Sequence, residues 1–176
     1  ATPDYSFHGM VMDNSEKLLD EIPKLVEAGI TTLKFFMAYK YTPFMVPDDL
    51  IFKSMQIAKN YGITIMVHAE NGDLVYTLQQ QLVIEGKIEP IYHAHSRPPE
   101  VEDEATSRAI TLAELADCPL FVVHVSSRGA AEHIRDARQR GLPISAQTCT
   151  HYLTLDESFL AKPTFEGANY VCSPAL

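Results

Sequence analysis

The chain lacks the features that mark secreted and membrane proteins. Its three cysteines, Cys118, Cys149 and Cys172, are odd in number and include no C-x-x-C pair, so neither a disulfide framework nor a structural zinc knuckle is indicated. No apolar run approaches the roughly 18 residues of a membrane span, and the first residues carry neither the basic nor the apolar region of a signal peptide. We therefore predict a protein of a reducing, cytoplasmic compartment.

Positive charge is scarce as well. Lysine and arginine number 14 against 23 aspartates and glutamates, which gives a formal net charge of −9, and no basic run interrupts this balance. Such a charge distribution disfavours binding to nucleic acid and to anionic membranes. A chain of 176 residues with 46% hydrophobic residues is large enough for one sizeable core. We therefore predict that residues 1–176 belong to a single domain, with neither nucleic acid nor membrane among its partners.

Hairpin turns are missing from the sequence, and predicted strands alternate with predicted helices throughout. This alternation indicates an α/β protein with a parallel sheet and crossover helices. The proline-rich interval 88–99 is predicted to be a loop. The β-type runs occupy 4–11, 30–39, 63–70, 120–127, 142–153 and 168–174, and the helical patterns occupy 15–29, 47–62, 71–86, 100–118 and 127–141.

Two α/β architectures fit this pattern, the doubly wound sheet and the (β/α)8 barrel. The phosphate-binding G-x-G-x-x-G fingerprint of doubly wound proteins is not found. In both architectures the functional residues gather at the carboxyl ends of the strands, and His68 and His124 stand there, each before a polar turn. Side chains from several successive strands converge naturally on a barrel axis, so we predict the barrel.

Three β-type runs carry one ionisable residue each: Lys34 in TTLKFFMAY, His68 in ITIMVHAE and His124 in LFVVHVSS. A charged, unpaired lysine in a buried run is costly. Lys34 must therefore be neutralised by an acid, act as a desolvated amine, or be carboxylated to a carbamate that supplies two oxygens. Neutral imidazole is the commonest nitrogen ligand of metals. Two histidines on neighbouring strand ends therefore predict a metal site.

Six stretches carry a family resemblance, in chain order and with natural spacing: TTLKFFMAYK, MVHAENGD, YHAHSRPPEVEDEA, VVHVSS, SAQTCTHYL and YVCSPAL. Together they closely resemble the D-hydantoinase/dihydropyrimidinase family of cyclic amidohydrolases, and the resemblance extends over essentially the whole chain. The resemblance implies a (β/α)8 barrel of the metal-dependent hydrolase type. It implies two metal ions, usually zinc, and a reaction that opens a cyclic ureide such as hydantoin or dihydrouracil. It also implies a homotetramer.

The resemblance gives roles to individual residues. Lys34 matches the carboxylated lysine that bridges the two metal ions, and His68 and His124 match the two ligands of the second ion. Tyr39 matches the tyrosine whose hydroxyl polarises the scissile carbonyl, an oxyanion-hole role. Ser173 matches the serine whose backbone holds the imide face of the substrate.

Other family features do not occur in this chain. The family holds its first metal ion with an H-x-H pair on the first barrel strand, and a last-strand aspartate serves as ligand and general base. The strand motifs present here resemble the third to seventh strands and the segment after them, and the family's SPPLR motif reads SPAL. A (β/α)8 barrel takes about 250 residues. We therefore expect an internal piece of such a barrel, weakly active or inactive alone.

Several polar residues near these motifs are predicted to have structural roles. His93 and His95 form an H-x-H, but it lies in a proline-flanked segment and is not expected to bind metal. Glu70 and Asp73 are predicted to cap the helix after His68 rather than to orient that histidine. The remaining histidines are expected to support the site (His151) or to lie at the surface or in ordinary packing (His8 and His133).

Two alternatives stay open. A sister enzyme, an allantoinase or a dihydroorotase, would share the barrel and the lysine, although the KFFMAYK and HAENGD contexts lean away from both. A non-catalytic dihydropyrimidinase-like scaffold protein would keep the barrel but lose metal ligands. The retention of the lysine, the two strand-end histidines and the tyrosine argues against a scaffold.

Overall fold

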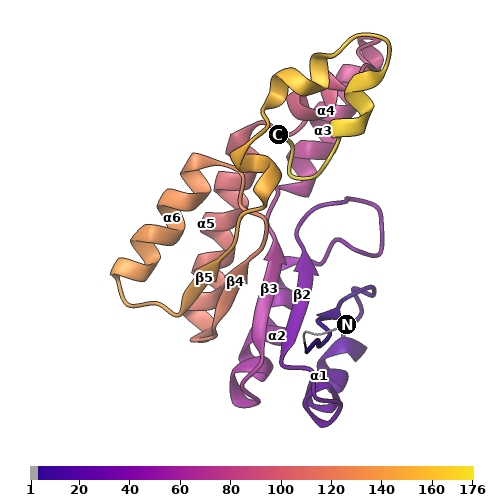
Figure 1. Cartoon of the computed structure of the whole chain (residues 1–176). Helices are drawn as coiled ribbons and strands as arrows, with labels where there is room; N and C mark the ends of the chain where they lie inside the picture. The colour runs from indigo at the N-terminus through magenta and orange to yellow at the C-terminus, as the bar shows by residue number, and fades with distance from the viewer. Residues whose placement is uncertain (1–3) are drawn as a thin grey trace.

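Five parallel strands lie side by side in the order in which they follow one another along the chain (Figure 1). The computed structural model describes residues 4–176. Every neighbouring pair of strands is parallel, as the alternation of strands and helices predicts. The strands are β1 (Gly9–Met10), β2 (Thr32–Phe36), β3 (Thr64–His68), β4 (Leu120–Val122) and β5 (Ile144–Ala146).

Six α-helices and three short 3-10 helices join and follow the strands. Within residues 4–176, none of them has both the length and the apolar composition that crossing a membrane requires. Their bounds are α1 (Lys17–Glu27), α2 (Asp48–Asn60), α3 (Gly72–Ile84), α4 (Ile91–His95), α5 (Pro99–Ala116), α6 (Arg128–Gln139), η1 (Thr150–Leu153), η2 (Glu157–Ala161) and η3 (Glu166–Tyr170).

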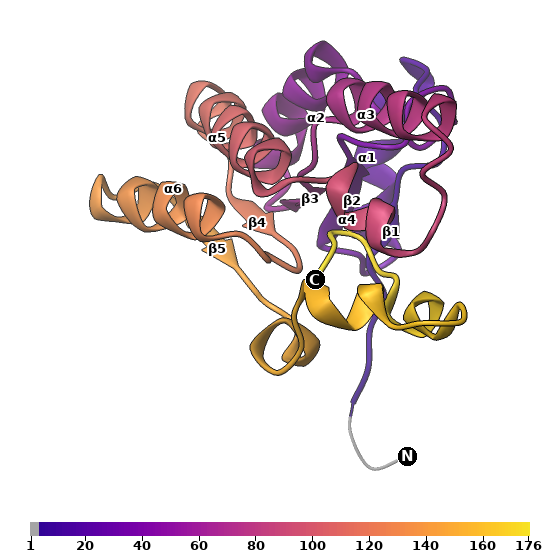
Figure 2. The same cartoon turned by 90° about the horizontal axis from the view of Figure 1, so that it is seen from above.

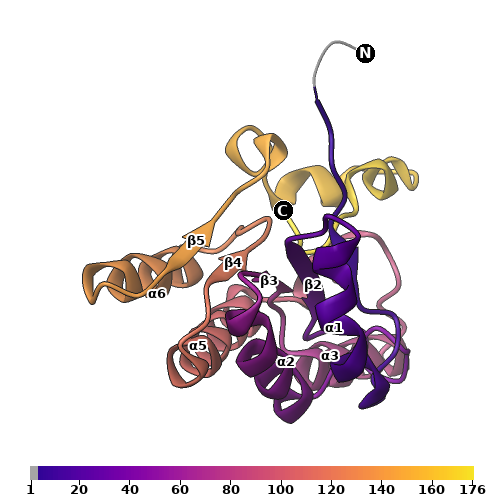
Figure 3. The same cartoon turned by 90° about the horizontal axis from the view of Figure 1, so that it is seen from below.

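The crossover helices cover one side of the sheet. α1 packs against α2, α2 against α5 and α5 against α6, and Figures 2 and 3 show these helices on the convex side of the curved strands. Sequential strand order with helices on one face is the pattern of a (β/α)8 barrel, whereas a doubly wound sheet reverses its strand order and has helices on both faces. The predicted barrel-type fold is therefore confirmed.

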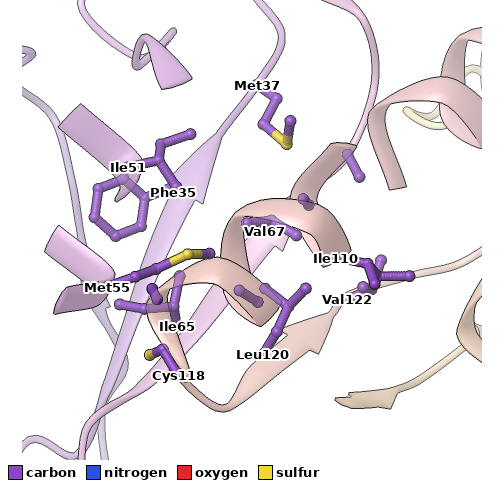
Figure 4. Close-up of a cluster of buried hydrophobic side chains, with 14 of the residues drawn as sticks. Phe35, Met37, Ile51, Met55, Ile65, Val67, Ile110, Cys118, Leu120 and Val122 are labelled. Carbon is purple, nitrogen blue, oxygen red and sulfur yellow. The ribbon is translucent and has the colours of Figure 1, made fainter. Parts of the chain in front are cut away.

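Side chains alternate between a face buried under the helices and the opposite, concave face. On β2, Phe35 is completely buried beneath the helices, and its half-buried neighbour Lys34 lines the concave face. This period of two residues is the property of a strand that packs on one side. Figure 4 shows the resulting core, to which the strands, the helices and the segments next to them contribute Phe35, Met37, Ile51, Met55, Ile65, Val67, Ile110, Cys118, Leu120 and Val122.

The concave face surrounds a cavity of ≈ 960 Å³. The strand register aligns Lys34 with Met66, Met66 with Phe121, and Phe121 with Ser145. One row of side chains from four strands therefore crosses this face. In a (β/α)8 barrel this face is the interior, so Lys34 is an interior residue of the barrel.

A group of short helices lies beyond the carboxyl ends of the strands. There α4 packs against η2, η2 against η3, and α3 against α4 (Figure 1). This group brings the C-terminal segment close to the strand ends, although the two are far apart in the sequence.

Several predicted elements differ from the structure. The predicted loop at 88–99 contains α4, because Pro90 already has helical geometry, with φ −54° and ψ −31°, and proline is tolerated at a helix start. The predicted β-like segment at 168–174 instead begins in η3, and its amides bond locally, as in Val171 N to Ala168 O at 3.3 Å. The strands predicted at 4–11 and 142–153 are shorter than expected, since only Gly9–Met10 and Ile144–Ala146 pair.

The start of α3 yields a test of the packing that positions the site. Gly72 N donates to Met37 O at 3.1 Å, and a Cβ at Gly72 would lie 2.9 Å from Ala38 Cα. Gly72→Ala forces two backbones apart, and we expect it to lower the free energy of unfolding by about 1–3 kcal/mol. Chemical denaturation of the intact protein measures this. The exposed change Gln80→Ala on the same helix is the control and should stay within about 0.5 kcal/mol of wild type; equal stability of both variants would contradict the close contact.

Candidate active site

Four of the five side chains predicted to form the site, Lys34, Tyr39, His68 and His124, come from β2, β3, β4 or the residues that directly follow these strands. Phe36, the last residue of β2, pairs with His68, the last residue of β3. β4 ends at Val122, and His124 then adopts the left-handed backbone region with φ 43°, which is uncommon for a residue other than glycine. His124 lines the concave cavity together with Lys34. Three successive strands therefore supply one edge with a lysine and two imidazoles.

His68 and His124 point ring nitrogens at each other. His68 Nδ1 lies 3.1 Å from His124 Nε2, and His68 is 1% exposed. Burial, with smaller electrostatic contributions from the neighbouring His68 and Lys34 when they are protonated, lowers the pKa of His124 to about 3. His124 is therefore neutral at physiological pH and keeps a nitrogen lone pair, which a metal ligand requires.

The geometry of this pair fits a shared metal ion. Two nitrogens bound at about 2.0–2.1 Å in a tetrahedral site lie about 3.3 Å apart, close to the 3.1 Å observed here. The other ring nitrogen of His124, Nδ1, is buried without a hydrogen-bond partner in the structure. The donor set and its spacing are therefore compatible with metal binding by this histidine pair.

Lys34 lies in the same cavity without an acidic partner. Among the residues that the structure describes, no carboxylate forms an ion pair with its Nζ, which lies 4.8 Å from the centre of the Phe36 ring. Burial lowers the pKa of Lys34. Of the three possibilities for Lys34, neutralisation by an acid of residues 4–176 is excluded. A desolvated amine, or the carbamate that such an amine forms with carbon dioxide, remains.

A buried carboxylate holds the far side of His68. Glu70 Oε2 lies 2.6 Å from His68 Nε2, and Arg97 Nε lies 3.3 Å from Glu70 Oε1, an ion-pair distance without hydrogen-bond geometry. Glu70 is 1% exposed and Arg97 9%. Burial alone would raise the pKa of Glu70, but the hydrogen bond from His68 and the charges of His68, Arg97 and His93 together lower it. Glu70 is therefore a buried negative charge between two nitrogen groups.

The prediction that Glu70 and Asp73 cap the following helix is wrong. The cap of α3 is Asn71, whose side chain accepts a hydrogen bond from Leu74 N at 3.1 Å. Glu70 points the other way, at His68, and Asp73 pairs with Lys40 at 2.6 Å. The asparagine satisfies the free amide of the helix, which leaves the glutamate available to the histidine.

Tyr39 lies beside His68, with ring centres 5.3 Å apart. Its backbone has φ 69°, and the N and Oγ1 of Thr42 both donate to its carbonyl, at 3.1 and 2.6 Å. Burial and the negative charge of Glu70 raise the pKa of the Tyr39 phenol, against a smaller opposing effect of the Ser173 hydroxyl. The phenol therefore keeps its proton at neutral pH and is available as a hydrogen-bond donor.

His93 holds the segment that carries Ser173. His93 Nε2 lies 2.7 Å from the Cys172 carbonyl and 3.3 Å from Ser173 Oγ. A carbonyl only accepts, so this nitrogen carries a proton and donates it. Tyr152 Oη donates to Pro174 O at 2.6 Å and fixes the other side of the same segment. No sequence pattern indicates this contact of His93, because it joins residues far apart in the chain.

None of the other histidines of residues 4–176 is hydrogen-bonded to His68 or His124, although His8 lines the same cavity as His124. Among residues 4–176, no group of three or more histidine, cysteine, aspartate or glutamate side chains is arranged to hold a metal ion. Two imidazoles and a lysine are therefore the candidate ligands that the described residues bring close together. The positions of the others are His95 beside Glu157 (3.0 Å), His151 against Tyr152 (ring centres 4.2 Å apart), His8 beside Thr32 (2.6 Å) and His133 exposed on α6.

The loop that follows His124 is held by a second buried carboxylate. Glu102 on α5 accepts hydrogen bonds from Ser126 N at 3.0 Å, Ser126 Oγ at 2.8 Å and Ser127 N at 2.7 Å. Burial raises the pKa of Glu102, and these hydrogen bonds oppose the rise without cancelling it. Glu102 thereby fixes the chain two residues beyond the predicted metal ligand, a role that no local sequence pattern indicated.

Comparison with known proteins gives the family. No family model matches the chain. The D-hydantoinase of Geobacillus stearothermophilus is 49% identical over 177 residues, which cover 100% of this chain and 37% of that protein. The dihydropyrimidinase of Arabidopsis thaliana is 42% identical over 98% of this chain and 33% of that protein. The crystal structure of the dihydropyrimidinase from Brevibacillus agri matches with a TM-score of 0.94 and 50% identity, over 98% of this chain and 38% of that chain. The chain is homologous to the D-hydantoinases and dihydropyrimidinases.

This homology confirms the resemblance predicted from the sequence motifs. The chain spans about 37% of the length of the hydantoinases that it matches, so it corresponds to part of their fold. The dihydroorotase of Campylobacter jejuni matches with a TM-score of 0.60 and 14% identity, which shows a shared fold alone. The dihydropyrimidinase structure from Brevibacillus agri, with its TM-score of 0.94 and 50% identity, is therefore far more similar to this chain than the dihydroorotase structure.

Glu102 provides a test of the hydantoinase-like loop after β4. Because the folded-state pKa of Glu102 is raised, its contribution to stability is fully present below the ordinary glutamate pKa and is lost as the pH rises through the folded-state value. We compare the free energy of unfolding of the wild type with that of Glu102→Gln. We expect the difference, wild type minus variant, to decrease as the pH rises above about 4. The decrease should be at most about 1.4 kcal/mol per pH unit. Denaturant unfolding at a series of pH values measures this difference. A difference that does not change with pH would contradict the assignment.

Proposed function

We propose that the intact protein is a metal-dependent cyclic amidohydrolase that opens hydantoin and dihydropyrimidine rings to N-carbamoyl amino acids. The observation that carries the proposal is the 3.1 Å distance between His68 Nδ1 and His124 Nε2, with His124 lining one cavity together with Lys34. The match of 97–100% of this chain to D-hydantoinases, of which it spans 37%, supports the substrate class.

The metal would be held by the residues that share this edge. His68 Nδ1 and His124 Nε2 would bind one ion, and a carbamate on Lys34 would bridge it to a second ion. We propose zinc, because neutral imidazole nitrogens suit it. When bound, the ions supply Lewis-acid polarisation of the amide carbonyl. The uncharged amine of Lys34 forms the carbamate by adding to carbon dioxide with loss of one proton, and its lowered pKa favours the amine form.

The side chains around the metal position act on the substrate. Tyr39 keeps its proton, so its hydroxyl can donate a hydrogen bond to the carbonyl oxygen of the scissile amide as negative charge develops there. The backbone of Ser173 holds the imide face of the ring, and His93 fixes that backbone through the Cys172 carbonyl. A donor aimed at a developing oxyanion stabilises the transition state more than the ground state, which is the contribution we assign to Tyr39.

Three predictions made from the sequence concern the intact protein. We propose that residues 1–176 are part of one barrel domain, that the protein assembles as a tetramer, and that it works in the cytoplasm. The homology to D-hydantoinases supports the first of these, and the other two follow from the family resemblance and from the cysteine pattern.

A substrate panel tests the proposed activity. The intact protein, supplied with zinc, should open hydantoin and dihydrouracil and should leave allantoin and dihydroorotate unchanged, as measured by release of the N-carbamoyl product. Activity should disappear with a chelator and return with added zinc. Ring opening of dihydroorotate alone, or no bound zinc and no ring opening of any substrate, would contradict the proposal and favour the sister enzyme or the scaffold.

Tyr39→Phe tests the oxyanion role. Because the change removes one donor to the developing charge, we expect kcat for hydantoin to fall by about 10²–10³-fold, with the bound-metal content unchanged. Tyr41→Phe on the same loop is the matched control, since Tyr41 is 78% exposed, and it should keep wild-type kcat. A wild-type kcat for Tyr39→Phe would show that the hydroxyl takes no part in the reaction.

A further inference from the structure

The side chains of Glu70 and His68 point to the same side of the chain where β3 ends. Residues two apart in an extended segment point to the same face, and β3 ends at His68. Asn71 takes the helix cap, so the Glu70 side chain is free to reach His68 Nε2 at 2.6 Å. The side chains of both residues are 1% exposed, so water does not compete for this hydrogen bond.

Arg97 balances the buried charge of Glu70 from another element. It follows α4 in the chain, and its side chain is 5% exposed. Its Nε lies 3.3 Å from Glu70 Oε1, whereas His68 is bound to the other oxygen, Oε2. The two partners therefore do not compete for one carboxylate oxygen. Buried ion pairs contribute little net stability compared with apolar packing, so stability alone does not account for this group.

The hydrogen bond decides which nitrogen of His68 is bare. An ionised carboxylate accepts and cannot donate, so the proton of a neutral His68 lies on Nε2, against Glu70. Nδ1 then has no proton, and it is Nδ1 that faces His124 Nε2. A glutamine at position 70 would not enforce this tautomer, because an amide can present either its oxygen or its NH₂ group to the ring.

We propose that Glu70, supported by Arg97, is a positioning residue that holds His68 in the tautomer needed for metal binding. This inference rests on the proposed function, because it gives the His68–His124 pair its role as ligands. A carboxylate behind a ligating histidine also raises the basicity of the ring and fixes its orientation. Glu70 thus acts on the metal through His68 and does not touch the substrate.

The first test uses the metal-free intact protein and requires no variant. Nitrogen-15 NMR of histidine side chains reports the tautomer of each ring. We expect His68 to carry its proton on Nε2 when it is neutral. A proton on Nδ1 of neutral His68 would overturn the inference, whatever the activity of the protein.

The second test measures cobalt binding by visible absorption and by metal analysis. We expect Glu70→Gln to weaken Co²⁺ binding at the His68–His124 pair by about 10–100-fold and to shift the His68 tautomer towards a mixture. Glu85→Gln is the matched control, because Glu85 is exposed and pairs with Lys87 at the surface; it should match wild type. Wild-type cobalt affinity in Glu70→Gln would overturn the inference.

The two tests separate this inference from the proposed function. Neither the tautomer nor the cobalt affinity depends on ring opening. If both measurements come out as expected and no cyclic ureide is opened, the reaction class is wrong and the role of Glu70 stands. If hydantoin is opened but the tautomer and the cobalt affinity do not respond to Glu70→Gln, the role of Glu70 is wrong and the reaction class stands.

Discussion

The register of the parallel strands is the constraint on which the site depends. β2 and β3 pair over five residues, which sets Phe36 beside His68 and Lys34 beside Met66. β4 pairs with β3 over only three residues, so the chain leaves the sheet before His124 and turns onto the concave face. Because side chains alternate across a strand, a slip of one residue would move Lys34 and His68 into the core beneath the helices. Correct register therefore precedes every contact of the site.

The segment between α3 and α5 contacts two separate parts of the candidate site, the segment with Ser173 and the Glu70 carboxylate behind His68. His93 donates to the carbonyl beside Ser173, and Arg97 lies against the carboxylate that holds His68. One short helix and the residues after it thus connect the segment expected to hold the substrate with a predicted metal ligand. A displacement of α4 would disturb both at once, which gives this surface element a functional reason to be well packed.

The features that could be predicted from the sequence are those that depend on local patterns of residues. Periodicity indicated parallel strands with crossover helices, and the motifs around Lys34, His68 and His124 indicated the site. The role of Glu70 was missed because a carboxylate after a strand suits both a helix cap and a histidine partner. That choice depends on the side chain of Asn71 and on Arg97 from a later element. The contact of His93 with the Cys172 carbonyl could not be predicted from the sequence either, because tertiary packing alone brings these residues together.

Metal binding by His68 and His124 is tested most directly by anomalous X-ray scattering at the zinc edge from crystals of the intact, active protein. We expect an anomalous peak between His68 Nδ1 and His124 Nε2, with electron density for a carboxyl group on Lys34 beside it. Active, zinc-loaded protein with no peak at this pair would show that these two histidines do not bind the metal.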